Sequence, residues 1–560
     1  MTALPAPDTV ALRPADVVMR LDRLGSAHQT RLSFLRALLR RMQAEHWRVS
    51  RERMDVDARG VGTAIYAVDV GARLYSLVAF GHELAPAKRT DRVIAEEWDA
   101  TFVLYDGLPD AAAISRLSEN VPLQEAGRYL ASELVLARAN RSVRLFDQVA
   151  AALAEGRQPD PASVEATGYL MRTTAVYGNG KFGIADRDLI KDRPETLGPF
   201  RAEMLTVYLI RMFTVDLVEH LAGLRGGASA TTLEPALRRR FGIGNATGLG
   251  MAPFLVKHPA LLDRWIAARE TALARVRAVG RADTASIASF RAALRNSHRL
   301  VAAWTTEDRQ QASRISRLRD DLQRLERYAT DGVFAMPRPW DALYRFAEAD
   351  LSLEGQEYAV TLLIEPHGDL VDDLAETMAV DETASFRIDG TMRCGDLERL
   401  IARHCDWALA LDFSGREALA RFWYVSEEKL EPRLGERFDE PGMEREQPLA
   451  VARDIVALTA ALDAENQDLP VAAFLLAHPE HRHTVRRIQI AARHPYSEIR
   501  DNLVGAQLRP IDILRCKLAF FGATRFDPRS DKWLRITLFQ GAPFPDELEA
   551  GNWDRWAYGE

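Results

Sequence analysis

Two glycine-rich stretches near the middle of the chain constrain its fold more than any other feature of the sequence. The first covers residues 177–183 and the second covers residues 242–250. Glycine destabilises helix interiors, so clusters of it mark backbone that turns sharply or comes close to another group. Both stretches interrupt segments with helical periodicity, and we expect each to form a loop between helices that carries a binding site.

The first stretch combines glycine with polar and basic side chains. Successive N–H groups on a curled backbone converge on an anion, and Lys181 adds a point charge for a carboxylate or phosphate. Lys181 is also a candidate catalytic base or Schiff-base amine, provided that burial lowers its pKa. The residues predicted to contact the ligand here are Arg172, Tyr177, Gly178, Asn179 and Gly180. The alternative is a plain turn with a solvated lysine, and the stretch matches neither the phosphate-binding loop of nucleotide hydrolases nor the dinucleotide-binding glycine pattern.

The second stretch places two hydrogen-bonding side chains, Asn245 and Thr247, among four glycines. Either side chain is a suitable cap for a new helix, whose N-terminus would bind an anion. We therefore predict that Asn245 and Thr247 contact the ligand. The competing interpretation is that Gly244 and Gly248 allow two helices to pack closely.

A third candidate is the dense polar segment that follows an apolar run, which we predict to be a buried strand. His494 is a candidate general acid or base near neutral pH. Tyr496 or Glu498 would orient it, and we count both as candidate catalytic residues. Arg500 would bind a carboxylate with two hydrogen bonds, and Asn502 completes the predicted ligand contacts. The alternative is a capped helix start with acidic residues in its first turn.

Histidine occurs beside carboxylates at two further places, which are His367 with Asp369 and the group of His478, His481 and His483. Histidine and carboxylate are ordinary metal ligands. Neither place has the spacing of a zinc protease motif, and a helix start and a polar loop explain these residues as well. We predict no metal and no cofactor, and a metalloenzyme that uses one of these groups is an alternative.

Length, charge and cysteine content narrow the class of protein. At 560 residues the chain is too long for one ordinary core. Its formal net charge of −7 argues against a nucleic-acid-binding surface. The three cysteines have no paired spacing, the first residues do not resemble a signal peptide, and no uncharged apolar run reaches about 18 residues. We expect a cytoplasmic protein that binds no nucleic acid and no membrane, and we leave a homo-oligomer open.

Hydrophobic periodicity predicts a helix-rich α+β chain. Residues 15–47 and most of residues 110–330 have helical spacing. Residues 62–80 alternate as in a strand–turn–strand hairpin, and a strand at 101–105 follows. The predicted strands of the last third cover residues 358–365, 407–413, 420–425, 483–491 and 534–539, and the predicted helices cover residues 395–404, 448–463, 471–477 and 510–520.

A short sequence pattern occurs twice in the chain, and this repeat, which we call the echo, suggests how the chain is divided into domains. Residues 67–73 resemble residues 410–416, and each segment precedes an apolar strand and a Leu-x-Pro sequence. The echo motivates a hypothesis of internal duplication, in which two mixed α/β modules flank a helical middle. The predicted domains are an N-terminal module at 1–125, a helical domain with the glycine-rich stretches at 126–335, and a C-terminal module at 336–560.

These features favour a soluble enzyme that acts on a small anionic metabolite, either a carboxylate or a phosphorylated compound. The chemistry would be acid–base or group transfer, as in a lyase, isomerase or transferase, without a redox cofactor. A non-catalytic scaffold or ligand-sensing protein is an alternative from another class. The enzyme hypothesis is strongest if the three polar segments share one site.

Overall fold

The computed structural model describes residues 10–89, 97–121, 130–178, 181–182, 192–246, 255, 258–378, 386–413, 422–426, 433–435, 443–448, 451–500, 510–527, 535–548 and 553–558. Contacts divide the chain into two compact units of three segments each. The sheet unit comprises His28–Thr247, Arg295–Ala312 and Phe521–Glu560, and the helical unit comprises Met1–Ala27, Gly248–Leu294 and Ser313–Phe520. The three continuous domains expected from the sequence stay a prediction.

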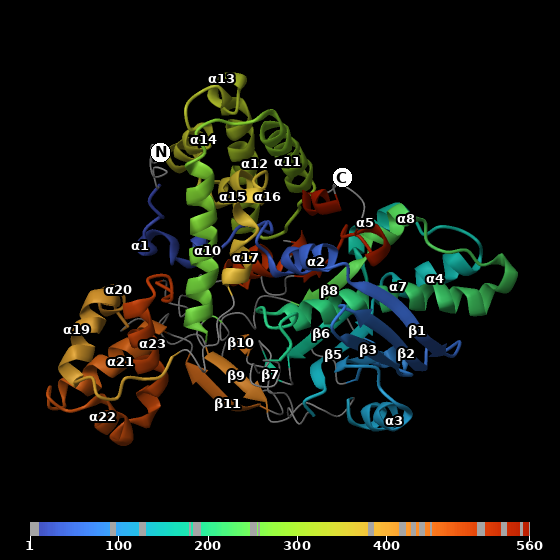
Figure 1. Cartoon of the computed structure of the whole chain (residues 1–560), viewed down its shortest axis with the longest axis horizontal. Helices are drawn as coiled ribbons and strands as arrows, with labels where there is room; N and C mark the ends of the chain where they lie inside the picture. The colour runs from blue at the N-terminus through green and yellow to red at the C-terminus, as the bar shows by residue number, and fades with distance from the viewer. Residues whose placement is uncertain are drawn as a thin grey trace, which may run out of the picture. The chain divides into compact units, whose positions relative to one another are not determined.

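A ten-stranded mixed sheet forms the centre of the sheet unit (Figure 1). Its strand order is β1-β2-β3-β4-β5-β6-β8-β13-β12, and β7 pairs with β6. All paired strands are antiparallel except β6 and β8, which are parallel. The strands are β1 (Arg48–Val56), β2 (Gly62–Asp69), β3 (Leu74–Gly81), β4 (Ala100–Asp106), β5 (Glu133–Arg141), β6 (Tyr169–Gly178), β7 (Lys181–Phe182), β8 (Gly242–Ala246), β12 (Ala523–Asp527) and β13 (Arg535–Leu538).

Helices cover both faces of this sheet. They are α2 (Phe34–Ala44), α3 (Ala111–Asn120), α4 (Phe146–Ala154), α5 (Pro161–Thr167), α7 (Arg201–Gly226) and α8 (Pro235–Arg240). On one face Phe213 of α7 packs edge to face on Phe102 of β4, and α4 lies beside α7 (Figure 1). Neighbouring residues of a strand point to opposite faces. The other face therefore carries the buried cluster of Ile65, Val78, Phe80, Val103 and Leu136, which includes Leu117 of α3 and the nearby Val121.

The sequence predicts the first strands of this sheet correctly. The hairpin expected at 62–80 is confirmed as β2 and β3, and Gly71 has a φ of 84° in its turn, a conformation that favours glycine. The strand expected at 101–105 is β4. Residues 130–153 were expected to be helical, but they form β5 and most of α4. Because β5 is buried on both faces, its apolar residues do not alternate clearly with polar ones.

Helices dominate the helical unit, and two of them, α11 and α12, extend past its limits. The helices are α1 (Ala15–Val18), α10 (Pro259–Arg277), α11 (Thr284–Ala302), α12 (Arg309–Tyr328), α13 (Asp331–Phe334), α14 (Pro339–Asp350), α15 (Leu353–Ile364), α16 (Gly368–Val371), α17 (Leu374–Thr377), α19 (Cys394–His404), α20 (Asp406–Leu409), α21 (Val451–Asp463), α22 (Val471–Ala477), α23 (Arg482–Arg493) and α24 (Pro510–Cys516). Three antiparallel strands, β9 (Phe422–Ser426), β10 (Arg433–Gly435) and β11 (Met443–Pro448), form a second sheet.

Three strands predicted in this unit are helices instead. Residues 358–365 lie in α15, which begins where Ser352 accepts a hydrogen bond from the N–H of Gly355. Residues 407–413 begin in α20, and residues 483–491 lie in α23. Short apolar runs do not distinguish a buried helix from a buried strand, which is why the sequence misleads here.

The remaining predictions for the last third agree with the structure. Predicted strands at 420–425 and 534–539 correspond to β9 and β13, and the predicted helices correspond to α19, α21, α22 and α24. A helix-rich α+β fold is therefore confirmed. The internal duplication is not confirmed, because the second copy of the echo begins in α20 instead of a strand. Within the described ranges, no helix is long and apolar enough to cross a bilayer.

Arg211 of α7 connects three parts of the sheet unit through backbone carbonyls. Its Nε donates to Phe241 O at 2.7 Å, and Nη2 donates to Ala542 O at 2.7 Å. Nη1 lies 3.4 Å from Pro543 O, and the guanidinium stacks 4.0 Å from the ring of Phe544. Burial lowers the pKa of Arg211 to about 9, so the side chain is still charged at neutral pH. Carbonyl dipoles therefore compensate this buried charge.

We predict that Arg211→Met destabilises the protein by about 2–4 kcal/mol, because buried carbonyls lose their donors. Arg240 of the neighbouring α8 provides the control, since its side chain is 48 % exposed and lies 3.9 Å from Glu165. Arg240→Met should change stability by less than about 0.5 kcal/mol. Denaturant unfolding of both variants checks this, and equal effects would contradict the role of Arg211.

Candidate functional site

The two glycine-rich stretches, predicted separately, begin on neighbouring strands of the sheet unit. Arg172 of β6 lies opposite Gly244 of β8, and Thr173 lies opposite Asn245. The side-chain amide of Asn245 donates to Thr173 Oγ1 at 2.8 Å. Because β6 and β8 are parallel, the two strands run towards the same edge of the sheet. The second stretch contains β8 itself, whereas the first begins in the last residues of β6.

Both stretches are attached to strands, which corrects the expectation of loops between helices. Gly178 pairs with Lys181, so β6 and β7 form an antiparallel pair at the end of β6. Asn245 is a strand residue and does not cap a helix. Asn179, Gly180, Thr247 and the side chains of Tyr177 and Lys181 lie outside the described part of the chain, so their predicted ligand contacts stay predictions.

A row of buried polar residues crosses the sheet beside Arg172. Asn140 of β5 lies opposite Arg172, and its side-chain oxygen accepts the N–H of Asp99 at 2.8 Å. The Asp99 carboxylate accepts Arg89 Nε at 3.0 Å and the backbone N–H of Arg141 at 2.9 Å. Two residues before Asn140 in β5, Arg138 stacks 4.1 Å from the ring of Trp98. No local pattern in the sequence indicates this row, because its residues come from distant segments.

The third predicted segment lies in the helical unit, directly after α23. Helix α23 ends at Arg493, and the N–H of His494 still donates to Ile490 O at 2.8 Å. This hydrogen bond holds the backbone of His494 against the last turn of α23. The sequence predicts a strand before this segment, but the structure has the helix α23 there. The polar segment itself begins where that helix ends.

Asp263 of α10 is the carboxylate beside His494. Its Oδ2 lies 3.4 Å from His494 Nδ1, and its Oδ1 accepts the backbone N–H of Tyr496 at 2.8 Å. Asp263 is buried, whereas the His494 side chain is 31 % exposed. Burial raises the pKa of Asp263, and the nearby His494 and Arg264 oppose that effect. A buried carboxylate against a partly exposed imidazole is the arrangement that orients a catalytic histidine.

The other predicted residues of this segment have different partners. Glu498 does not orient His494, because it forms a buried ion pair with Arg487, with Nε–Oε2 at 2.6 Å. The hydroxyl of Tyr496 donates to the carbonyl of Arg13 at 2.8 Å instead of contacting the imidazole. The backbone N–H of Arg500 donates to Met19 O at 2.8 Å, and Asn502 lies outside the described residues.

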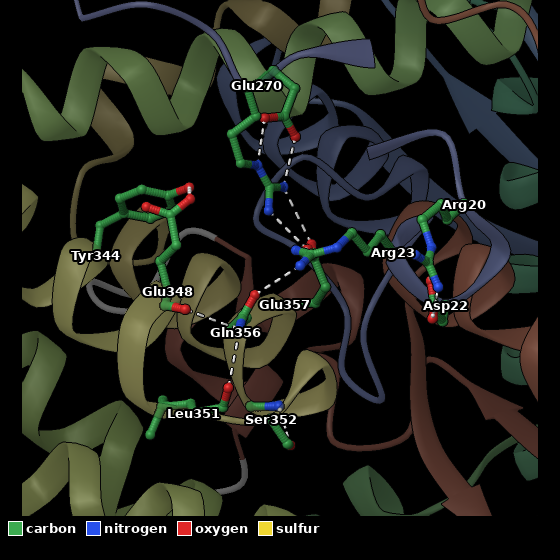
Figure 2. A network of polar contacts seen from close by, with 12 residues as sticks. Arg20, Asp22, Arg23, Glu270, Tyr344, Glu348, Leu351, Ser352, Gln356 and Glu357 are labelled. Atoms are coloured by element: carbon green, nitrogen blue, oxygen red, sulfur yellow. Dashed lines mark hydrogen bonds and ion pairs between the residues drawn. The ribbon is translucent and has the colours of Figure 1, made fainter. Parts of the chain in front are cut away.

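A buried ionic network surrounds Arg13 in the same unit. Figure 2 shows its members Glu270, Glu357 and Arg23. The Arg13 guanidinium binds Glu270 of α10 through Nε at 2.7 Å and Nη2 at 2.8 Å. It also binds Glu357 of α15 through Nη1 at 2.7 Å. Arg269 and Arg23 complete the network, at 3.0 Å from Glu270 and 3.1 Å from Glu357 respectively. Three guanidiniums thus surround two carboxylates.

Positive charge is also exposed beside the His494–Asp263 pair. Arg264 directly follows Asp263 in α10, and Arg493 directly precedes His494 in the chain. Both side chains belong to exposed residues, and Arg493 lies 5.3 Å from the ring of Phe386. Exposed guanidiniums are groups that attract anions from solution.

The histidines considered for a metal site have ordinary contacts. His367 is buried and packs edge to face on Trp340, with ring centroids 4.8 Å apart. His478 lies 3.4 Å from Glu465 and 3.6 Å from Glu480. Among the residues that the structure describes, no group of three or more histidine, cysteine or acidic side chains is arranged to hold a metal ion.

The three predicted segments therefore give two places of interest, one in each unit. Arg172 and Asn245 belong to the sheet unit, and His494 belongs to the helical unit. We treat the His494–Asp263 pair as the candidate catalytic site, because it contains a titratable side chain that is both oriented and accessible. The sequence identified His494 but missed Asp263, Arg13 and Arg264.

Asp454 of α21 lies near the Arg487–Glu498 pair, and burial raises its pKa to about 6. The folded state therefore binds a proton that the unfolded chain releases, and the protein loses stability as pH rises from about 4 through 6. We predict that Asp454→Asn is more stable than the wild type at pH 7 by about 1–3 kcal/mol, and that this difference disappears near pH 4.

Denaturant unfolding at both pH values measures this difference. Asp463→Asn, an exposed change on the same helix, is the control and should alter stability little at either pH. A variant at position 454 that is less stable than the wild type at pH 7 would show that the carboxylate stabilises the fold through Arg487.

Comparisons of the chain with protein-family models, with curated proteins and with solved structures gave no match. The function is therefore argued from the geometry of the described residues.

Proposed function

We propose that this protein is an enzyme that acts on a small anionic metabolite through acid–base chemistry, with His494 as the general acid or base. The observation that carries the proposal is the His494–Asp263 pair, in which a buried carboxylate faces a partly exposed imidazole at 3.4 Å. This distance is long for a hydrogen bond. Catalytic hydrogen bonds often shorten when the substrate binds, so the distance is compatible with the role.

Asp263 favours one form of the imidazole. Its Oδ2 faces Nδ1, which is best satisfied when Nδ1 carries the proton and donates it to the carboxylate. The lone pair is then on Nε2, where it can accept a proton from a substrate. After the transfer, the same carboxylate stabilises the imidazolium. This is how the pair would remove or return a proton in a lyase, isomerase or transferase reaction.

The exposed arginines beside the pair indicate an anionic substrate. A guanidinium binds a carboxylate or a phosphate with two parallel hydrogen bonds, so Arg264 and Arg493 suit either class. In the sheet unit, Arg172, Asn245 and Lys181 remain a predicted anion site. A cytoplasmic location and a homo-oligomeric state likewise remain predictions.

A thermal-shift screen against carboxylates and phosphorylated compounds identifies the ligand class, because a ligand that binds the folded state raises its stability. With a substrate found, we predict that His494→Gln lowers kcat by about 10²–10⁴-fold, the usual contribution of a general acid or base. Stability should change little, since the side chain is partly exposed.

His478→Gln is a closely matched control. His478 also lies 3.4 Å from a carboxylate, Glu465, and its side chain is 32 % exposed, but that carboxylate is 33 % exposed. The control should retain full turnover. If His494→Gln turns over substrate as fast as the wild type, His494 is not the acid or base. If the protein binds ligands but converts none of them, it is a ligand-sensing protein.

A further inference from the structure

The segment of residues 13–24, which we call the N-terminal strap, is fixed in the helical unit by ion pairs near both ends. At one end Arg13 binds Glu270 of α10 and Glu357 of α15. At the other end Arg23 binds Glu357 at 3.1 Å, and its carbonyl accepts Arg269 Nη1 at 2.9 Å. The strap is therefore attached to two helices that are far from it in sequence (Figure 2).

Two carbonyls of the strap hold the segment that follows His494. The carbonyl of Arg13 accepts the hydroxyl of Tyr496 at 2.8 Å, and the carbonyl of Met19 accepts the N–H of Arg500 at 2.8 Å. Tyr496 and Arg500 lie two and six residues after His494. The conformation of this segment therefore depends on the strap in addition to α23.

Tyr496 connects the strap to the candidate catalytic pair. Its side chain bonds to Arg13, while its backbone N–H donates to the Asp263 carboxylate at 2.8 Å. That carboxylate uses its second oxygen to face His494. Burial, with the charge of Glu270, raises the pKa of Tyr496 to about 12, so the hydroxyl remains a donor at neutral pH.

We propose that Arg13 is a positioning residue for the His494–Asp263 pair, acting through its carbonyl on Tyr496 and through its side chain on α10. The ion pairs with Glu270 and Glu357 place the Arg13 backbone, that backbone places Tyr496, and Tyr496 places Asp263 against the imidazole. This inference rests on the proposed role of His494. If Arg13 has this role, detachment of the strap changes the orientation of His494 relative to Asp263.

Active sites often contain residues that do not touch the substrate but hold a catalytic residue in position. Arg13 itself has a buried side chain whose two partners are both carboxylates of the network, so it does not contact a substrate. Its effect must reach His494 through Tyr496 or through α10, which carries both Glu270 and Asp263. Each route predicts a change in the imidazole when the strap is altered.

Long-range ¹H–¹⁵N spectra of the histidine rings in the full-length protein test this inference without a substrate. The signals of His494 are assigned by their loss in His494→Gln. In the wild type we expect the proton on Nδ1. Tyr496→Phe removes only the hydroxyl donor, and Arg13→Met removes the ion pairs. Both should increase the share of the Nε2–H form several-fold.

Arg20→Met is the matched control within the strap, because the Arg20 side chain is 49 % exposed and, within the described chain, pairs with the neighbouring Asp22. It should leave the His494 signals unchanged. Asp263→Asn should shift the tautomer in any case, since it removes the facing carboxylate. If Asp263→Asn shifts the tautomer and Tyr496→Phe does not, the strap has no positioning role although the pair is real.

If Asp263→Asn also has no effect, the pair itself is wrong and the proposed function fails with it. Arg13→Met leaves Glu270 and Glu357 buried with fewer partners and can unfold the protein. Tyr496→Phe retains the ring and its packing, so the inference is decided by that variant when Arg13→Met does not fold.

Discussion

The helical unit depends on the ion pairs of Arg13, which join a segment near the start of the chain to α10 and α15. The partners are 257 and 344 residues away in sequence, and all three side chains are almost completely buried. Such a network contributes little net stability compared with apolar residues of the same shape, but loss of one member leaves a charge buried without its partner and costs several kcal/mol, about 3–5. The network therefore specifies one arrangement of these elements.

The sequence predicts the helix-rich α+β class and the β2–β3 hairpin, because each produces a local pattern. It also singles out His494 among polar neighbours, but the strand expected before His494 is α23. It does not predict Asp263 or Arg13, whose roles depend on contacts between distant segments. One signal was available in α10, where Asp263, Glu270 and Arg277 are spaced by seven residues and so share a helix face. Each binds a group from another element, and Arg277 binds Asp341 at 2.7 Å. Charges that recur every seven residues on one face of a helix indicate ion pairs with neighbouring elements.

For the glycine-rich stretches, the sequence reveals the residues themselves but not the structure around them. Their surroundings were predicted wrongly, because β5 is buried on both faces and its apolar residues do not alternate clearly with polar ones. Only the sheet brings Arg172 next to Gly244 and Thr173 next to Asn245. Carboxylates compensate Arg13 in the helical unit and Arg89 in the sheet unit, whereas backbone carbonyls compensate the buried Arg211.

The central claim is that the Arg13 network maintains the conformation of the segment after His494. Amide hydrogen exchange in wild type and Glu357→Gln tests it most directly, because the N–H groups of Tyr496 and Arg500 bond to Asp263 and to the strap. We predict that the exchange of these two amides accelerates by about tenfold or more in the variant, while amides within α21 exchange as before. Unchanged exchange at Tyr496 and Arg500 in a folded variant would contradict the account.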